Sequence, residues 1–204
     1  MIRIVFFRTP DFAVTCLKEL LAAEGIKVAA VVSAPDKPGR RGRQLQANPV
    51  SAMARDRGLL LLQPERLRDE DFIATLQSLN ADLFAVVAFR MLPEVVWSMP
   101  RFGSLNIHGS LLPDLRGAAP IQWSIALGDR LTGLTAFSLN NAIDEGPILA
   151  QTEVEIGPNE TFSSLYDRMA AQGSQLALSV LQEMDSKVHP IIAQNREEMH
   201  RSAP

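Results

Sequence analysis

RIVFFRTPDFAVTCLKELLAAEGIKVAAVVSA, residues 3–34, decides the fold class of this chain. It opens and closes with a continuous apolar run, Arg3–Phe7 and Lys27–Ala34. Runs of this kind are typical of strands buried on both faces, as in a parallel sheet covered by helices. Between the two runs apolar residues recur at helical spacing, and Gly25 is placed to end the helix. The stretch therefore predicts a strand, a helix and a second strand.

The same alternation continues toward residue 127. Asn48 followed by Pro49 is typical of a helix N-cap and the first helical position. We expect three further strands and three further helices, the strands at Leu59–Leu62, Asp82–Phe89 and Ser104–Ile107 and the helices within 48–58, 68–80 and 120–127. This order predicts an α/β fold with an open, mostly parallel, doubly wound (Rossmann-like) sheet and helices on both faces.

The pattern changes after Gly128. Two apolar stretches, Gly133–Asn140 and Pro147–Ile156, predict strands joined by a turn, and this pair could end the sheet in antiparallel fashion. A long helix follows over 159–184, with an apolar face made of Phe162, Leu165, Met169, Leu176 and Val180. We expect Asn159 or Thr161 to cap it. From Ser186 the periodicity is lost, which is typical of a linker.

Composition excludes several classes of protein. The 204 residues carry a formal net charge of −3, so there is no global basic field and any nucleic-acid contact needs a local basic patch. A single cysteine excludes an internal disulfide framework. The first apolar run is too short for a signal peptide, and no window approaches 18 apolar residues. We therefore expect a cytoplasmic protein that makes no membrane contact. We also expect a monomer, although composition does not determine the oligomeric state.

Asn106 and His108 are two positions apart at the end of an expected strand. Residues two apart share a face of a strand, so both side chains project beyond the carboxyl edge of the sheet, where open α/β folds bind ligands. An amide and a protonated imidazole at one point form an oxyanion-binding pair, and Asp144 in the late turn is the best candidate to keep that imidazole protonated. The ordinary alternative is that Asn106 caps the strand and His108 is a solvated loop residue.

The surrounding residues resemble a known family. NIHGSLLPDLRGAAPIQW (106–123) and AIDEGPILAQ (142–151) are similar to the folate-dependent formyltransferases, whose pattern is N-x-H, SLLP, an RG step and then D-x-G-x-I. Within that family, TPDFAV (9–14), APDKPGRRGRQLQANPV (34–50) and LQPERLRDEDF (62–72) resemble the methionyl-tRNA formyltransferases. The resemblance is collinear from Met1 to the long helix.

The resemblance implies a reaction. Members of the family transfer a formyl group from 10-formyltetrahydrofolate to an amine, here the amino group of methionyl initiator tRNA in translation initiation, and the chemistry needs no metal. Asn106 and His108 would stabilise the developing oxyanion, while Asp144 would orient His108 and help to move the proton. The resemblance also implies that residues 1–185 form the catalytic domain and that residues 186–204 lead toward a C-terminal domain that this chain does not contain.

The resemblance further implies two binding segments. Folate would contact the SLLP loop and the residues after the fourth expected strand, which are Ser110, Leu111, Leu112, Pro113, Phe89, Arg90, Met91 and Leu92. For Met91 and Leu92 a place in the core is an equal alternative. Initiator tRNA would meet a basic loop that carries Lys37, Arg40, Arg41 and Arg43, whose ordinary alternative is a solvated surface.

Three alternatives stay open at the level of function. The chain could use formyl-folate to modify a small amine or a nucleotide-sugar amine, it could release formate by hydrolysis, or it could bind folate without turnover. Arg8 departs from the family, which usually has glycine there, so this side chain would either obstruct the mouth of the site or add a phosphate contact. His189 and His200 have no ligand cluster around them in the sequence, which gives little support to a zinc site.

Overall fold

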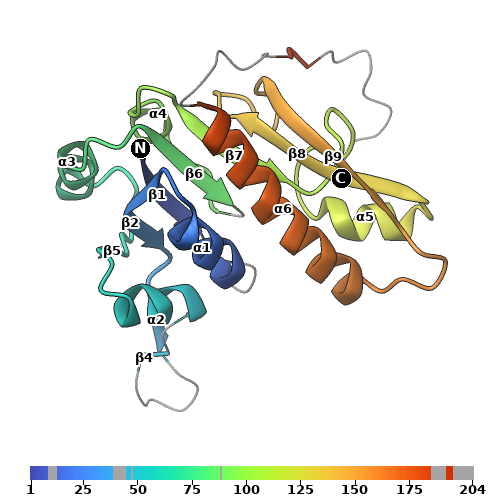
Figure 1. The fold of residues 1–204 in the computed structure, drawn as a ribbon, viewed down its shortest axis with the longest axis horizontal. Helices are drawn as coiled ribbons and strands as arrows, with labels where there is room; N and C mark the ends of the chain where they lie inside the picture. The colour runs from blue at the N-terminus through green and yellow to red at the C-terminus, as the bar shows by residue number, and fades with distance from the viewer. Residues whose placement is uncertain (9–12, 39–44, 47, 88, 185–191, 195–204) are drawn as a thin grey trace. The chain divides into compact units, whose positions relative to one another are not determined.

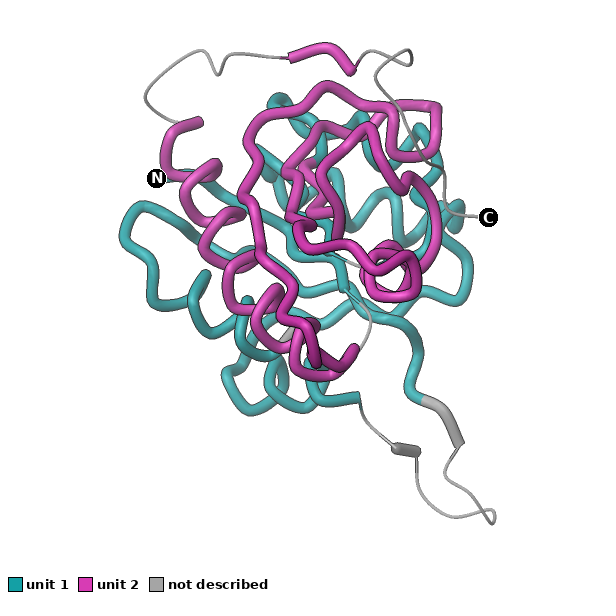
Figure 2. The backbone as a smooth tube through the Cα atoms, turned by 90° about the vertical axis from the view of Figure 1, so that its right-hand side faces the viewer, with its two compact units in different colours: residues 1–104 teal, residues 105–204 magenta. Residues whose placement is uncertain are grey.

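Two compact units divide the chain, unit 1 at residues 1–104 and unit 2 at residues 105–204 (Figure 2). The structure is a computed structural model, and it describes residues 1–8, 13–38, 45–46, 48–87, 89–184 and 192–194. The parallel strand pairs lie in unit 1 and the antiparallel pairs of the sheet in unit 2.

Four parallel strands form the sheet of unit 1, in the order β5-β2-β1-β6 (Figure 1). β1 (Ile2–Arg8) lies between β2 (Ile26–Ser33) and β6 (Leu83–Val87), and the short β5 (Leu61–Leu62) pairs with β2. All of β6 and all but one residue of β1 are buried. Continuous apolar runs predict this pattern, because a strand covered on both faces has no solvent-facing positions.

One helix of unit 1, α2 (Pro49–Asp56), begins where its sequence signal places it. It has Asn48 as its N-cap, with Asn48 Oδ1 accepting a hydrogen bond from Ser51 N at 2.9 Å. Unit 1 also contains α1 (Ala13–Ala22), α3 (Glu70–Ser78) and α4 (Glu94–Trp97). Both α1 and α2 pack against β2. Gly25 follows α1 with a φ of 79°, a conformation that glycine adopts without strain.

Unit 2 contains an antiparallel set of strands with a long helix beside it. β8 (Leu131–Ser138) pairs with β7 (Ser104–His108) and with β9 (Ile148–Glu155). α6 (Phe162–Met184) packs against β8, β9 and α5 (Pro120–Ala126), as Figure 1 shows. Its buried positions include the predicted residues Leu165, Met169, Leu176 and Val180.

The predicted open, mostly parallel α/β class is confirmed, and so is the antiparallel pairing of the last two strands. Thr161 rather than Asn159 caps α6, since Thr161 Oγ1 accepts a hydrogen bond from Ser164 N at 3.3 Å. Phe162 was expected on the buried face, but it is 39% exposed because it is the first residue of the helix.

The sequence did not predict three short elements. α4 spans a single turn, and the pair β3 (Lys37–Pro38) and β4 (Leu45–Gln46) has only two residues in each strand. Elements this short carry no periodicity from which they could be recognised. The predicted boundary between residues 185 and 186 lies outside the described residues and stays a prediction.

Candidate active site

β7 presents Asn106 and His108 on one face of unit 2. In the antiparallel register Asn106 stands opposite Phe137 and His108 stands opposite Thr135. Asn106 is half-buried, and the described residues offer its amide no hydrogen-bond partner within the protein. The His108 side chain is only 7% exposed. The alternative of a solvated loop histidine is therefore wrong, while the Asn106 amide can still bind a ligand atom.

His108 and Asp144 lie close together, as strand parity and the position of the turn predict. His108 Nδ1 is 3.6 Å from Asp144 Oδ2, an ion-pair contact rather than a hydrogen bond. The same carboxylate oxygen accepts the backbone N–H of Gly117 at 2.9 Å. The RG step of the loop after β7 therefore holds the carboxylate that faces the imidazole.

The second ring nitrogen of His108 also faces an acceptor. His108 Nε2 is 2.9 Å from the backbone oxygen of Leu115. A carbonyl oxygen can only accept, so Nε2 carries the hydrogen in this contact. With Leu115 O on one side and Asp144 Oδ2 on the other, both ring nitrogens of His108 face oxygen atoms.

The backbone around His108 adopts conformations that side chains disfavour. Leu115, Ala119 and Asp144 have positive φ values of 54°, 58° and 52°. A residue with a Cβ pays about 1 kcal/mol or more in this region, and such residues cluster at functional sites. The two loops that meet at His108 are therefore held in place by their surroundings.

Gly146 allows the Asp144 turn to approach β8. A Cβ at this position would lie 1.6 Å from the carbonyl oxygen of Ser138. Ser138 N donates to Pro147 O at 2.9 Å, which fastens the turn to the end of β8. The glycine of the D-x-G-x-I pattern is therefore required by close backbone contact.

The SLLP loop is anchored from two strands of unit 2. Thr135 Oγ1 on β8 donates to Ser110 O at 2.7 Å and accepts from Leu112 N at 3.0 Å. Gln151 Nε2 on β9 donates to Leu112 O at 2.9 Å and to Thr135 Oγ1 at 2.9 Å. Ser110 and Leu112 are consequently buried, while Leu111 and Pro113 are half-buried.

The predicted folate residues of unit 1 follow β6. Arg90 donates from Nη1 to Glu65 O at 2.8 Å and from Nη2 to Pro64 O at 2.6 Å, so it ties this segment to the QPER stretch. Met91 is 74% exposed, which overturns the core alternative for it, whereas Leu92 is 6% exposed and buried. Phe89 packs edge-on against Phe7 of β1, with ring centroids 5.6 Å apart.

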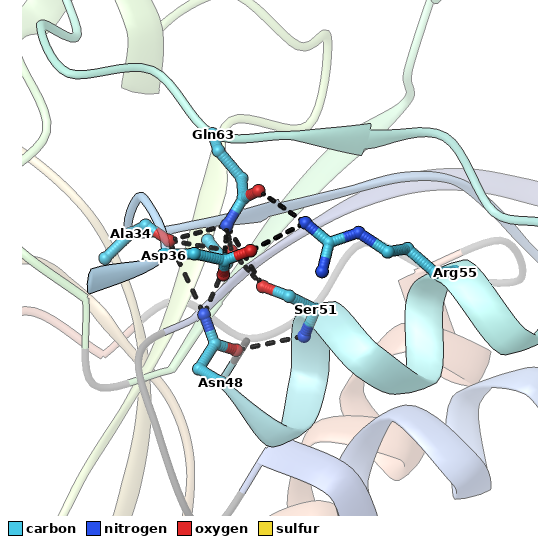
Figure 3. Close-up of polar contacts among 7 residues, drawn as sticks. Ala34, Asp36, Asn48, Ser51, Arg55 and Gln63 are labelled. Atoms are coloured by element: carbon cyan, nitrogen blue, oxygen red, sulfur yellow. Dashed lines mark hydrogen bonds and ion pairs between the residues drawn. The ribbon is translucent and has the colours of Figure 1, made fainter. Parts of the chain in front are cut away.

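A second polar cluster lies in unit 1 at the base of the basic segment (Figure 3). Gln63 Nε2 donates to Ala34 O at 2.9 Å and to Asp36 Oδ1 at 2.8 Å. Arg55 Nη2 of α2 donates to Asp36 Oδ2 at 2.7 Å and to Gln63 Oε1 at 3.0 Å. Asp36 directly precedes β3 and Asn48 follows soon after β4, so the cluster joins the two ends of segment 37–46 to α2 and to the stretch after β5.

The Asp36 carboxylate is ionised by its partners. Burial alone would raise the pKa of Asp36, but the hydrogen bonds from Arg55 and Gln63 outweigh burial and hold the pKa below its usual value. The side chain of Asp36 is 9% exposed, whereas that of Arg55 is 49% exposed. The pair is therefore partly screened by water, and its contribution to stability is modest.

Most of the predicted tRNA contacts fall outside the described residues. Arg40, Arg41 and Arg43 are not described, and of Lys37 only the backbone is described, as the first residue of β3. The basic segment thus stays a prediction, although the cluster at its base is well defined.

The chain matches the formyl transferase family over residues 2–181. It belongs to the formyl transferase family. Two relatives named methionyl-tRNA formyltransferase are 46% identical to it. The protein of Bacteroides thetaiotaomicron aligns over 191 residues, 93% of this chain and 59% of the relative, and that of Synechococcus elongatus over 198 residues, 96% and 61%. The chain therefore spans about three fifths of the length of these relatives.

Solved structures of other formyltransferases share the fold. Glycinamide ribonucleotide transformylase 1 from Symbiobacterium toebii superposes with a TM-score of 0.76 at 22% sequence identity, covering 96% of this chain and 95% of that chain. At this level of identity the likeness establishes the architecture of the family.

Sequence reasoning missed four side chains that hold the site of this formyl transferase family member. Thr135 and Gln151 support the SLLP loop, and Arg116 and Gln194 contact the Asp144 turn. Arg116 and Gln151 lie inside the stretches that carry the resemblance, so the sequence could have pointed to them. No local signal marked Gln194, which lies in the non-periodic tail.

The sequence also singles out Arg8 and candidate metal ligands. The Arg8 side chain is fully buried at the end of β1, in register with Ser33 and Val87, which does not fit a solvent-facing phosphate contact. His189 and His200 lie outside the described residues. Within the described ranges, His, Cys, Asp and Glu side chains form no group of three that could hold a metal ion. No helix in the described part of the chain is both long and apolar enough to span a bilayer.

Proposed function

We propose that this chain transfers a formyl group from 10-formyltetrahydrofolate to the amino group of methionyl initiator tRNA, in the cytoplasm, for translation initiation. The observation that carries the proposal is 46% identity over 93% of the chain to a protein named methionyl-tRNA formyltransferase. The polar groups of unit 2 support it, because an amide, an imidazole and a carboxylate lie where β7 ends.

The residues of unit 2 would act on the charge that develops when the amine attacks the formyl carbon. Asn106 would donate a hydrogen bond to the formyl oxygen as it becomes negative. Among the described residues its amide has no hydrogen-bond partner, which supports this role. His108 would donate a second, charge-assisted hydrogen bond to the same oxygen. The loss of one such donor typically costs about 100- to 1,000-fold in rate.

His108 can take this role only after one contact is exchanged. Its Nε2 donates to Leu115 O, and its Nδ1 faces Asp144. The substrate oxygen would therefore replace the carbonyl oxygen of Leu115.

Asp144 would orient His108, and it would help to move one proton. A bond forms between the amine nitrogen and the formyl carbon, and the bond from that carbon to the folate nitrogen breaks. The proton leaves the attacking amine and ends on the folate nitrogen, through His108, Asp144 or a water between them. No electron is gained or lost overall.

Folate supplies the formyl group already activated on nitrogen. Leu111 and Pro113 of the SLLP loop offer half-buried apolar surface of the kind that a pterin ring needs, and Thr135 with Gln151 holds their loop. In unit 1 the exposed Met91 and the backbone of residues 89–92 are the other predicted folate contacts, and they stay a prediction.

The basic segment would bind the tRNA acceptor end. Lys37, Arg40, Arg41 and Arg43 provide four positive charges against Asp36 alone, and contacts between such side chains and phosphates dominate affinity for nucleic acids. The carboxylate of Asp36 accepts hydrogen bonds from Arg55 and Gln63. This support distinguishes tRNA from a small amine as the acceptor.

The test is a formyl-transfer assay with three acceptors. The chain alone, and the chain fused to the remaining part of one of its longer relatives, receive 10-formyltetrahydrofolate with charged initiator tRNA, with glycinamide-type small amines, or with water only. We expect formyl-methionyl-tRNA as the main product, formed faster by the fusion. Turnover of small amines alone, release of formate alone, or folate binding with no turnover would each contradict the proposal and identify one of the three alternatives.

A further inference from the structure

Residues 192–194 return to unit 2 at the beginning of β9. Ile148 N donates to Ile192 O at 2.8 Å, and Ile192 N donates to Ile148 O at 3.0 Å. The two residues thus form an isolated antiparallel bridge. Ile148 stands four residues after Asp144, so the bridge brings Gln194 beside the turn that carries the carboxylate.

The Gln194 amide uses both of its ends. Its Oε1 accepts from Arg116 Nε at 3.1 Å and from Arg116 Nη2 at 2.7 Å. Its Nε2 donates to Asp144 O at 3.0 Å and to Gly146 O at 2.7 Å. Because a guanidinium only donates and a backbone carbonyl only accepts, these partners determine which way the amide points.

Arg116 connects this amide to the other side of the Asp144 carboxylate. Its side chain is 9% exposed, and its Nη1 lies 3.4 Å from Glu145 Oε1. The next residue, Gly117, donates its N–H to Asp144 Oδ2 at 2.9 Å. Asp144 is therefore held at its carbonyl by Gln194 and at its carboxylate by the residue that follows Arg116.

We propose that Gln194 is a positioning residue for formyl transfer. It fastens the Asp144 turn to Arg116, and so keeps the Asp144 carboxylate facing His108. Asp144 needs such support because its φ of 52° is unfavourable for a residue with a side chain. The inference rests on the proposed function of Asp144 and His108, and it assigns a role in the reaction to a residue that follows α6.

Two substitutions test the amide of Gln194. Gln194→Ala removes both the oxygen that accepts from Arg116 and the nitrogen that donates to the Asp144 turn. Gln194→Glu keeps the size of the side chain and the acceptor for Arg116, but it replaces the donor to Asp144 O and Gly146 O by a second acceptor. Since misplacement of a catalytic group by about 1 Å can cost about 100-fold, we expect both variants to lower kcat by about 10- to 100-fold. KM for the formyl donor should change by less than about twofold, because Gln194 touches no substrate.

The matched control is Gln182→Ala. Gln182 is an exposed glutamine on α6, outside both polar clusters, and its loss should leave kcat and KM at parental values. Parental kcat in Gln194→Glu would overturn the proposal, since the donor half of the amide would then be dispensable. A fall in melting temperature of more than about 10 °C in both Gln194 variants would also overturn it, because Gln194 would then be a general contact of the fold.

A second readout does not depend on turnover. The Gly117 amide proton reports the place of the Asp144 carboxylate, so hydrogen exchange measured by NMR should speed up at Gly117 by about tenfold or more in Gln194→Ala. It should stay unchanged in Gln182→Ala. If the parental chain fails to formylate methionyl-tRNA, the proposed function is wrong, yet Gly117 still tests the positioning. Unchanged exchange at Gly117 would overturn the positioning itself.

Discussion

A carboxylate lies at the centre of each of two polar clusters, Asp36 in unit 1 and Asp144 in unit 2. Asp36 accepts hydrogen bonds from an arginine and a glutamine on a backbone of ordinary conformation. Asp144 itself has a positive φ, it faces a histidine, and it lies beside loops in which Leu115 and Ala119 are also strained. In unit 1 the described residue with a side chain and a positive φ is Asn80, a type that tolerates this region.

The difference suits two roles, structural support for the Asp36 cluster and the proposed reaction for the Asp144 cluster. Each oxygen of the Asp36 carboxylate accepts a hydrogen bond from a side chain, which is typical of a joint between segments. In the Asp144 cluster the Asn106 amide has no hydrogen-bond partner among the described residues, and His108 faces two oxygen atoms. Strained backbone of the kind found there is concentrated at functional sites. Substitution of His108 should therefore lower the rate of formyl transfer, and substitution of Asp36 should lower the free energy of unfolding.

The largest effect should follow from His108→Ala. We expect the rate of formyl transfer at saturating methionyl-tRNA to fall by about 1,000-fold, while formyl-folate binds within a few-fold of the parental affinity. Single-turnover transfer and equilibrium binding measure the two quantities. Intact transfer would show that the reaction does not need His108. The two clusters would then not differ in their role in catalysis.

Gly146→Ala should act on stability first. The added Cβ would meet the backbone oxygen of Ser138, so the Asp144 turn must shift, and we expect a loss of about 3 kcal/mol in the free energy of unfolding. Urea denaturation measures this loss. Gly157→Ala is the control, because a Cβ there would lie no nearer than 3.7 Å to the side chain of Glu160. Equal stability in the two variants would show that unit 2 is not held tightly at this turn.

Asp36→Asn should have a smaller effect that depends on pH. The pKa of Asp36 is lowered in the folded chain, so its contribution is present above the unfolded pKa, near pH 4, and is lost as the pH falls through the folded value. We expect a loss of about 1 kcal/mol at pH 7, modest because the partner Arg55 is half-exposed, and this loss should shrink as the pH falls below about 4. Urea unfolding at a series of pH values from 7 downward measures it. A loss that stays constant over the whole series would rule out an ionic origin.

The smallest effects should come from single basic residues. The test uses the chain fused to the remaining part of one of its longer relatives. In that fusion, Arg41→Ala or Arg43→Ala should weaken tRNA binding by a few-fold and flatten its salt dependence by slightly less than one unit of slope. Formyl-folate binding should not change. Titrations of tRNA at several salt concentrations measure the slope. An unchanged slope would make the segment an ordinary solvated surface, and tRNA would lose its main support over a small amine.

Much of the site could be predicted because its signals are local. Strand parity placed Asn106 and His108 on one face, and the turn placed Asp144 near them. In the structure Asp144 Oδ2 lies 3.6 Å from His108 Nδ1. The contacts that hold these residues join distant parts of the chain. Thr135 binds a loop residue 25 positions away, and Gln194 binds Asp144 across 50 positions and Arg116 across 78. A hydrogen bond of this kind leaves no trace in periodicity or spacing.

The amino-acid sequence by itself determined the α/β class, the order of the elements and the residue types brought to the end of β7. Apolar periodicity, caps and turn residues act over a few positions, so they can be read before folding is known. Only the tertiary structure decided that His108 faces both Asp144 and Leu115, that Gly146 must remain without a side chain, and that a tail residue holds the turn. These relations depend on which distant segments meet, and the close packing of the folded chain decides that.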